Sequence, residues 1–423
     1  MNKNAKELNL IVKNENPIVY SMLSKKGREI FFPKNGIIAQ SAEAKDSDIN
    51  ASIGIAFNDD NSPLILDIIS KKLKLKNKNA FTYAPSYGKP QLRKKWKEMI
   101  LKKNPSLFDN ISLPVVTSGL THGHSIFKYL FIEDEIIIPD PFWGNYNLIF
   151  TNGQSTKIKK FPLFSDGFNI TDLEKMLNSD GEKKVLLFNF PNNPTGYTPT
   201  TKEVEMIVEV IKNSAKNGKK IVVICDDAYF GLVYEKGIYQ ESIFSKLANI
   251  HKNVLAVKVD GVTKEDYAWG FRIGFITFGT KDGNEKLYSA LADKAAGVVR
   301  KSISSACHLS QTFLLDAFED PNYEKEKNEN YKILKNRYKM VKKVLAKYDN
   351  KYFDPLPFNS GYFMCLKLKG VDAEKVRQKL LKKYNTGVIA IDDKLRIAFS
   401  SAPLSKIEKL FENIYLTCKE EMK

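Results

Sequence analysis

Short runs of β-branched and apolar residues alternate with longer amphipathic stretches through the middle of the chain. This alternation predicts an α/β fold in which βα units build a mainly parallel central sheet flanked by helices. The predicted strands span residues 114–118, 135–139, 185–190, 221–226, 253–259 and 271–278. Helices are predicted at 91–102 and 201–216. The first follows Pro90 and carries apolar residues at helical spacing, which are Leu92, Trp96, Met99 and Ile100.

The pattern changes after about Cys307. A long charged helical stretch at 330–348 leads into apolar runs at 361–367, 388–391 and 395–399. The last two runs flank Asp392 and Asp393, and this arrangement predicts a hairpin. We therefore expect a large domain at 55–306 and a smaller α+β domain at 307–423, to which the N-terminal segment 1–54 contributes.

Composition supports a large folded core. With 423 residues, of which 43% are hydrophobic, the chain is long enough for two domains. Its longest apolar runs, 184–190 and 221–225, fall short of the about 20 residues that span a bilayer, and no apolar signal segment precedes Pro17. The four scattered cysteines contain no CxxC pair. These features predict a soluble protein of the reducing cytoplasm with no membrane partner, no disulfide framework and no zinc site.

The formal net charge of +17 raises the question of a nucleic-acid partner. The lysines, however, are spread along the whole chain and interleaved with Glu and Asn, as at 324–328. This mixing is typical of a solvated surface, so we expect no nucleic-acid partner.

Chemically informative residues follow several predicted strands, where ligands bind in open α/β sheets. Asp226 and Tyr229 end one strand, and a buried carboxylate beside a pyridine nitrogen keeps that nitrogen protonated. Lys264 follows the next strand, and a desolvated lysine can form a Schiff base. The segment 117–121 links a strand to a helix start, where free N–H groups favour a phosphate.

Four motifs in this order closely resemble class I aminotransferases of fold type I, the aspartate aminotransferase type. They are Asn192-Asn-Pro-Thr-Gly196, Asp226-Asp-Ala-Tyr229, Thr263-Lys264 with Arg272, and Arg396 in Leu-Arg-Ile-Ala-Phe. The resemblance covers nearly the whole chain, beginning at 53–60. It implies ping-pong transamination between an amino acid and a 2-oxo acid with pyridoxal 5′-phosphate (PLP) as cofactor. The donors considered are aspartate, another dicarboxylic amino acid or an aromatic one.

The resemblance also implies roles for residues around the cofactor ring. Lys264 would hold PLP as a Schiff base and shuttle the substrate proton. Asp226 would pair with the ring nitrogen, Asn193 and Tyr229 would bond the phenolic oxygen, and Trp143 would stack on the ring.

The phosphate ligands implied by the resemblance are the backbone around Gly119 and Leu120, the hydroxyls of Thr121 and Thr263, and Arg272. The family often has Ser three positions before the lysine, where this chain has Gly261, and Ser118 is a candidate replacement. Tyr83 would reach the phosphate from a neighbouring subunit, which implies a homodimer with shared active sites.

For the substrate, the resemblance implies that Arg396 binds the α-carboxylate with Gly54 close by. Arg300 falls where aspartate-specific members carry an arginine for the distal carboxylate of the partner's substrate. A plain surface arginine remains the alternative for this position.

Two histidines and one cysteine near these motifs have simpler interpretations. His122 and His124 are expected to cap or pack a helix start, with no metal, and Cys225 is expected to be a small buried apolar group. Three other functions on the same fold stay open at this point: a β-eliminating C–S lyase, a PLP-sensing regulator and an acyl-transferring synthase.

Overall fold

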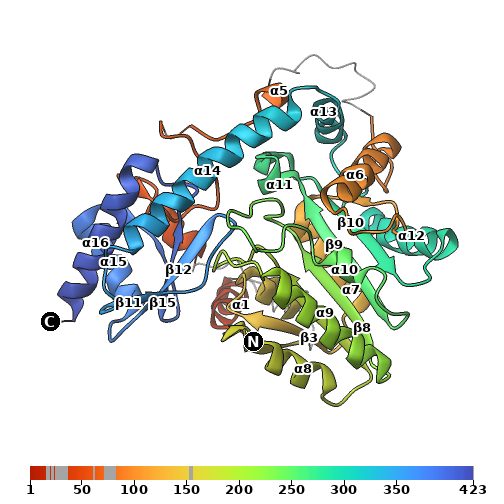
Figure 1. Cartoon of the computed structure of the whole chain (residues 1–423), viewed down its shortest axis with the longest axis horizontal. Coiled ribbons are helices and arrows are strands. Elements are labelled where there is room, and N and C mark those ends of the chain that lie inside the picture. The colour runs from red at the N-terminus through yellow and green to blue at the C-terminus, as the bar shows by residue number, and fades with distance from the viewer. Residues whose placement is uncertain are drawn as a thin grey trace.

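The computed structural model describes residues 1–15, 20, 23, 37–60, 62–70, 82–151 and 156–422. Its centre is a seven-stranded sheet with the order β2-β10-β9-β8-β7-β3-β4 (Figure 1). These strands are β2 (Val115–Thr117), β3 (Glu135–Asp140), β4 (Lys157–Pro162), β7 (Lys183–Asn189), β8 (Lys220–Asp226), β9 (Val254–Gly261) and β10 (Gly274–Thr280). Only β10 runs against its neighbours, β9 and β2, so the sheet is mainly parallel.

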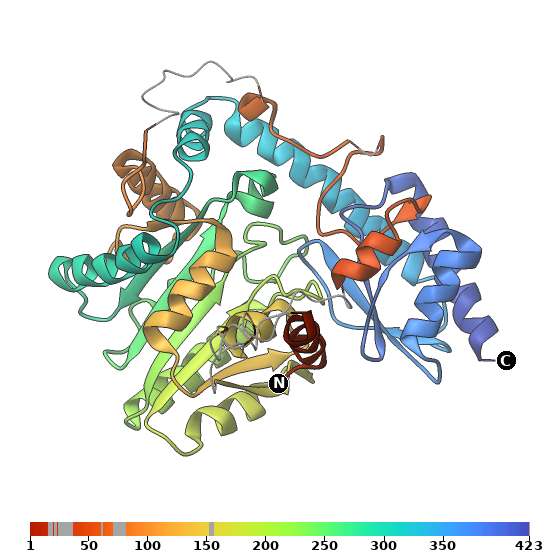
Figure 2. The ribbon, with the colours of Figure 1, turned by 180° about the vertical axis from the view of Figure 1, so that it is seen from behind.

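Helices cover both faces of this sheet, so β7 and β8 are buried along almost their whole length and are apolar in their middle. Helices α8 (Ile170–Asn178) and α9 (Thr201–Lys216) lie on the face toward the viewer in Figure 1. Helix α7 (Gly119–Phe131) lies on the opposite face, toward the viewer in Figure 2. The other helices around this sheet are α6 (Pro90–Lys103), α10 (Phe244–Leu247), α11 (Val262–Glu265), α12 (Glu285–Ser302) and α13 (His308–Phe318).

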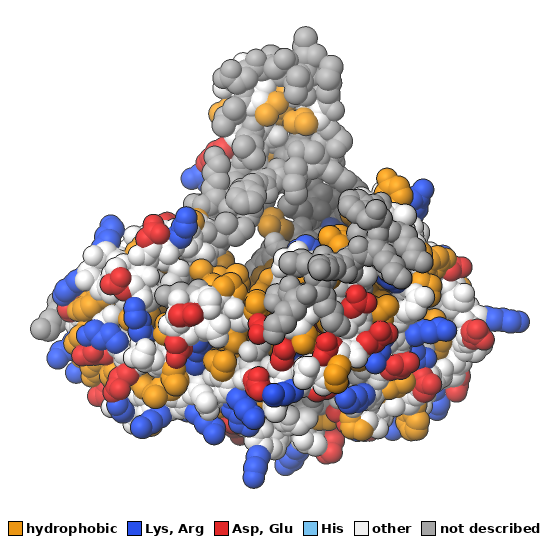
Figure 3. Space-filling view, turned by 90° about the horizontal axis from the view of Figure 1, so that it is seen from above, with side chains coloured by type: hydrophobic (Ala, Val, Ile, Leu, Met, Phe, Trp, Pro, Cys, Tyr) orange, Lys and Arg blue, Asp and Glu red, His pale blue; other side chains and the backbone are white. Residues whose placement is uncertain are grey.

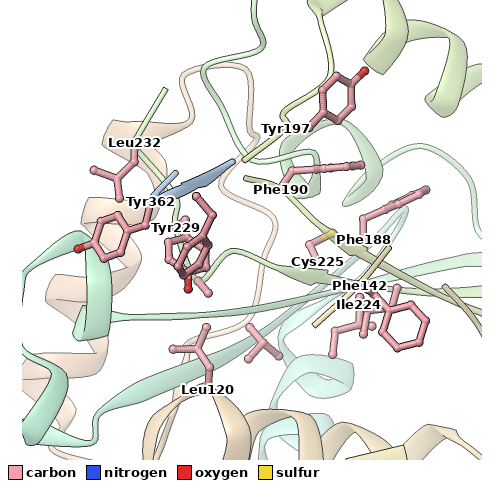
Figure 4. Packing of buried hydrophobic residues seen from close by; sticks show 14 of the residues in the cluster. Leu120, Phe142, Phe188, Phe190, Tyr197, Ile224, Cys225, Tyr229, Leu232 and Tyr362 are labelled. Carbon is pink, nitrogen blue, oxygen red and sulfur yellow. The ribbon is translucent and has the colours of Figure 1, made fainter. Parts of the chain in front are cut away.

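Aromatic side chains fill the core near the carboxyl ends of the strands (Figure 4). Phe188 and Phe190 at the end of β7 stack with ring centroids 5.5 Å apart. Trp96 of α6 stacks on Phe275 of β10 at 4.2 Å. Cys225 is fully buried in the same core, as expected of a small apolar group. Stacked rings of this size bury large apolar areas, so they stabilise this end of the sheet.

A second, antiparallel sheet has the order β11-β12-β15-β14. Its strands are β11 (Phe353–Pro355), β12 (Phe363–Leu368), β14 (Ile389–Ile391) and β15 (Lys394–Ala398). The predicted hairpin is confirmed, since β14 and β15 pair around Asp392 and Asp393, and Asp392 has a φ of 50°. Helices α15 (Ala373–Tyr384) and α16 (Ile407–Glu421) belong to the same part of the molecule as this sheet.

The N-terminal segment contributes to this second part of the molecule. Strand β1 (Ile49–Asn50) pairs in parallel with β13 (Thr386–Gly387). Helix α14 (Tyr323–Leu345) runs from the large sheet to the small one (Figure 1). The remaining short elements are α1 (Lys3–Glu15), α4 (Ile37–Glu43), α5 (Asp67–Ser70), β5 (Phe164–Ser165) and β6 (Gly167–Phe168). The exact domain boundaries stay a prediction.

The structure departs from the sequence prediction at three places. The strand predicted at 271–278 begins only at Gly274, because Arg272 is left-handed with a φ of 52° and ends a short 3-10 turn. Strand β4 was not predicted, since its sequence KIKKFP is largely exposed at the sheet edge. The long charged helix begins at Tyr323, earlier than the predicted 330.

The surface mixes charges of both signs. On the face seen in Figure 3, lysine and arginine side chains are interspersed with aspartate and glutamate. None of the helices in the described part of the chain is long and apolar enough to cross a membrane.

Candidate active site

The carboxyl ends of the central strands open into one cavity of about 260 Å³. In the parallel register Asn189 of β7 lies opposite Asp226 of β8, so these ends are level. Eleven of the residues singled out from the sequence line the cavity: Gly54, Leu120, Thr121, Trp143, Asn193, Asp226, Tyr229, Thr263, Lys264, Arg272 and Arg396. The lining also includes Ser52, Tyr146 and Phe363. Residues more than 340 positions apart thus meet at one site.

Asp226 is a buried carboxylate with only 3% of its surface exposed. Its Oδ2 accepts hydrogen bonds from His124 Nε2 at 2.7 Å and from the Tyr146 hydroxyl at 2.5 Å. Its Oδ1 accepts the backbone N–H of Ala228 at 3.0 Å. Burial raises the pKa of Asp226, but His124 and these hydrogen bonds outweigh burial and bring the pKa below its ordinary value. The carboxylate is therefore held ionised.

The two side chains that hold Asp226 were missed or underestimated from the sequence. His124 was expected to cap or pack the start of α7; it does pack there, fully buried against Tyr146, but its hydrogen bond to Asp226 was not predicted. In the sequence, the only indication of this contact was that His124 lies on the inner face of that helix. His122 does match the capping prediction, since its Nδ1 accepts the N–H of Ser118 at 3.1 Å. Tyr146 had no signal beyond its closeness to Trp143, whose ring meets it edge-on at 5.4 Å.

Lys264 is presented by the four-residue helix α11, directly after β9. Its Nζ lies 5.2 Å from the centre of the Tyr229 ring. Desolvation, helped by the positive charge of Arg272, lowers the pKa of Lys264 to about 8, and the opposing attraction of Asp226 does not cancel these effects. A larger fraction of this amine is therefore neutral near pH 7 than in an ordinary lysine.

Anion-binding groups converge at the start of α7. Gly119 has a φ of 75°, and a Cβ there would lie 2.6 Å from Arg272 Nη2, so this guanidinium packs directly on the backbone. Thr121 and Thr263 line the same part of the cavity. Within the described part of the chain the buried Thr263 hydroxyl has no hydrogen-bond partner. Two hydroxyls, a guanidinium and a helix N-terminus together form a site suited to a phosphate.

The position three residues before Lys264 has no room for a side chain. A Cβ on Gly261 would lie 2.7 Å from both the Cα of Gly274 and the carbonyl oxygen of Ile273. A Cβ on Gly274 would in turn lie 2.8 Å from the carbonyl carbon of Gly119. Because Gly119, Gly261 and Gly274 pack backbone to backbone, a serine at 261 does not fit this chain. Ser118, the candidate replacement, does not line the cavity.

A buried arginine lines the same cavity as Lys264. Arg396 of β15 donates to Ser52 O at 3.0 Å and, more weakly, to Asn193 Oδ1 at 3.4 Å. Its guanidinium lies 4.3 Å over the Phe363 ring, and a Cβ on Gly54 would lie 3.3 Å from the same ring. The Arg396 Nε has no partner among the described residues. A carboxylate could take up this unused donor capacity.

Four predicted site residues do not line this cavity: Ser118 and Gly119 lie beside it at the start of α7, and Tyr83 and Arg300 lie elsewhere on the surface. Tyr83 is 89% exposed. Arg300, near the end of α12, is exposed and donates to Ser304 Oγ at 2.7 Å. Neither residue lines the cavity of its own chain.

A family model described as aminotransferase class I and II matches residues 48–414. The chain belongs to this family. Among its relatives, the aspartate aminotransferase of Bacillus sp. (strain YM-2) is 26% identical over 291 residues, 67% of this chain and 68% of the relative. The fold class and the family resemblance are thus confirmed, and the protein is a PLP-dependent transaminase.

Solved structures agree with this aminotransferase in fold. An aminotransferase from Anaerococcus prevotii DSM 20548 superposes with a TM-score of 0.83 at 23% identity, covering 95% of this chain and all of the other. Pyrococcus horikoshii kynurenine aminotransferase, solved in complex with PMP, gives a TM-score of 0.79 at 19% identity, covering 96% and 98%.

The chemistry of the residues that line the cavity fits PLP. The unpartnered Thr263 hydroxyl and the Gly119 backbone against Arg272 suit the phosphate. The ionised Asp226 suits a pyridinium nitrogen. Lys264 lines the same cavity, and its amine can react with an aldehyde. No donor in this set conflicts with the charge of the cofactor.

Gly261→Ala is expected to destabilise the aminotransferase by about 2 kcal/mol or more, because the new Cβ meets backbone atoms that cannot move aside. Gly297→Ala on α12 is the matched control, since its Cβ would meet nothing within 4 Å. Urea unfolding of both variants measures the difference. Equal stability of the two variants would contradict the close backbone packing.

The pKa of Lys264 predicts its reactivity in the cofactor-free protein. Acylation of Lys264, followed by peptide mass spectrometry, is expected to rise with pH and to reach half its maximum near pH 8. The amine is neutral above this pH and protonated below it. Free N-acetyl-lysine amide in the same reaction serves as the reference. A midpoint for Lys264 equal to that of the reference would contradict the desolvated environment.

Proposed function

We propose that Lys264, Asp226 and Arg396 carry the transamination of this enzyme. The observation that supports the proposal is their convergence in one cavity, with the amine, the ionised carboxylate and the guanidinium each arriving from a different element. When bound, PLP supplies an aldehyde and an electron-accepting ring. The remaining chemistry, which is orientation, proton transfer and exclusion of water, belongs to the chain's own residues.

Lys264 is the proposed general base at the substrate Cα. Its Nζ takes the Cα proton of the amino acid and later returns a proton on the same side. A base works best when its pKa lies near the working pH, and the lowered pKa of about 8 meets this condition better than an ordinary lysine. The nearby Arg272 and the desolvated wall both keep the amine available in its neutral form.

Asp226 is the proposed partner of the ring nitrogen. His124 and Tyr146 fix its Oδ2 and keep its charge, the Ala228 N–H holds Oδ1, and the residue lines the cavity. A fixed negative charge at this position favours a protonated ring nitrogen. Asn193 and Tyr229, which both line the cavity, are proposed to bond the phenolic oxygen, and Trp143 to cover the ring face.

The phosphate is proposed to lie at the start of α7. Its ligands would be the backbone N–H groups of Gly119 and Leu120, the hydroxyls of Thr121 and Thr263, and Arg272. Ser118 would contribute through its place at the same helix start rather than through the cavity lining.

Arg396 is the proposed ligand of the substrate α-carboxylate. Guanidinium and carboxylate match in bidentate geometry, and burial strengthens the pair. The Phe363 ring under the guanidinium keeps water from that side, and Gly54 leaves room for the substrate. Because Arg396 and Lys264 line one cavity from different elements, a carboxylate held at Arg396 would orient the substrate Cα toward the amine.

We further propose a cytoplasmic homodimer with shared active sites. Tyr83 is almost fully exposed, as expected of a side chain that contacts another subunit, and it would reach the partner's phosphate site. Arg300 would approach the partner's substrate in the same way. Of the donors considered, aspartate or another dicarboxylic amino acid would use Arg300, whereas an aromatic donor would not need it.

The donor is identified by adding aspartate, glutamate, alanine or an aromatic amino acid singly to the PLP-loaded enzyme. The correct donor is expected to bleach the cofactor absorbance band and to release one matching 2-oxo acid per site. Lys264→Ala should lower the rate by about 100-fold or more, because the base is lost. The exposed Lys281→Ala is the control and should react normally. Release of pyruvate and ammonia, with no amino group retained on the cofactor, would indicate a lyase instead.

Shared active sites predict complementation between two inactive variants. A dimer of one Lys264→Ala chain and one Tyr83→Ala chain has one intact site, because each site takes its lysine and its tyrosine from different chains. Equal mixing by co-expression is expected to give about a quarter of the wild-type activity, since half of the dimers are hybrids with one working site each. Activity no higher than the sum of the separate variants would contradict the shared site.

A further inference from the structure

Two acidic residues follow Lys264 directly, and both are buried. Glu265 is 3% exposed and Asp266 is fully buried. They point away from the substrate cavity, since neither of them lines it. A buried carboxylate is costly unless it is paired, so two in succession beside the reactive lysine require a specific arrangement of cations and donors.

Three side chains provide this arrangement. Lys103 Nζ lies 3.0 Å from Glu265 Oε1, and Lys327 Nζ lies 2.7 Å from the same oxygen. Lys327 also reaches Asp266 Oδ1 at 3.1 Å, where the Tyr323 hydroxyl donates at 2.5 Å. We call these five residues, Lys103, Glu265, Asp266, Tyr323 and Lys327, the lysine clamp.

The clamp connects the Lys264 turn to two distant helices. Lys103 ends α6, whereas Tyr323 and Lys327 are one turn apart at the start of α14. The same α14 carries Arg337, which donates to the carbonyl oxygen of Ser400 in the C-terminal part. The Lys264 turn is thus tied to the helix that runs between the two sheets (Figure 1).

The turn needs outside support because it has little structure of its own. Helix α11 has only four residues, and it is followed by Tyr267, which has a φ of 56°. Besides β9 and the clamp, the Tyr362 hydroxyl donates to the Lys264 carbonyl oxygen at 3.0 Å. The direction of the Lys264 side chain therefore depends on the contacts made by its two acidic neighbours.

The clamp pairs charges of opposite sign. Lys103 and Lys327 face Glu265 and Asp266, and burial raises the pKa of Asp266 above its ordinary value although Lys327 opposes this. Burial raises the pKa of Glu265, but the two lysines outweigh burial and lower it to about 2, so Glu265 stays charged. The pKa of Lys264 is shifted by burial, Asp226 and Arg272, so the clamp acts on that residue through its position rather than its charge.

We propose that Lys103, Lys327 and Tyr323 are positioning residues, which hold Lys264 Nζ at the substrate Cα by fixing Glu265 and Asp266 from behind. The inference rests on the proposed role of Lys264 as the base. A base displaced by about 1 Å loses much of its rate advantage, while the binding of the substrate carboxylate at Arg396 is unaffected.

Lys327→Met tests the proposal, with Lys325→Met as the matched control because Lys325 is exposed on the same helix. In the PLP-loaded enzyme, Lys327→Met is expected to lower the single-turnover rate with the donor about tenfold, while the donor KM stays within about twofold of wild type. In the cofactor-free protein, backbone amides of 262–268 are expected to exchange with deuterium about tenfold faster. Tyr323→Phe should also lower the single-turnover rate and speed the exchange of these amides, but less than Lys327→Met does.

The proposal is overturned if Lys327→Met keeps the wild-type turnover rate and exchange, if Lys325→Met has an equal effect, or if the loss lies in KM alone. Should Lys327→Met not fold, Tyr323→Phe decides, and wild-type values of rate and exchange in that variant overturn the proposal. A wild-type enzyme that transfers no amino group from any donor would contradict the proposed function, whereas the deuterium exchange would still report on the clamp.

Discussion

The charge on Asp226 is the constraint on which the rest of the active site depends. A carboxylate removed from water at the end of a buried strand is stable only with several donors, and the fold brings three of them from separate places. His124 comes from α7, Tyr146 from the loop after β3, and the Ala228 N–H from the turn that follows β8. The order of strands in the sheet builds the site around this carboxylate. Strands β7 and β9 flank β8 and bring Asn189 and the Lys264 turn to its carboxyl end.

Much of this could be predicted from the sequence, for a physical reason. Strands buried on both faces leave continuous apolar runs, and helices leave their own period, so β7, β8, α6 and α9 were placed within a few residues. Residues directly after such strands meet at one edge of the sheet. The predicted set around Asp226, Lys264 and Arg396 therefore lines a single cavity.

Other features depend on contacts that the local sequence does not encode. Nothing near His124 indicates that it will face Asp226, which is 102 positions away. The clamp likewise joins Glu265 to Lys103 and Lys327 across long separations. Strand β4 was not predicted because an exposed edge strand needs no apolar alternation. Tyr83 and Arg300 are predicted to act on another subunit, so a single chain cannot bring them to their sites.

The packing of Gly119, Gly261 and Gly274 restricts how this chain can vary in evolution. The Gly274 backbone occupies the space that a side chain on Gly261 would need, the Gly119 backbone occupies the space that one on Gly274 would need, and the Arg272 guanidinium occupies the space beside Gly119. A side chain at Gly261 could be accommodated only if the strands β9 and β10 moved apart, which would also shift Gly274 against the start of α7. The three positions are therefore not independent, and the effects of changing them should be strongly non-additive. A homologue with a serine at the position of Gly261 would need a wider spacing between these strands, so that one residue marks a different backbone beneath the phosphate site.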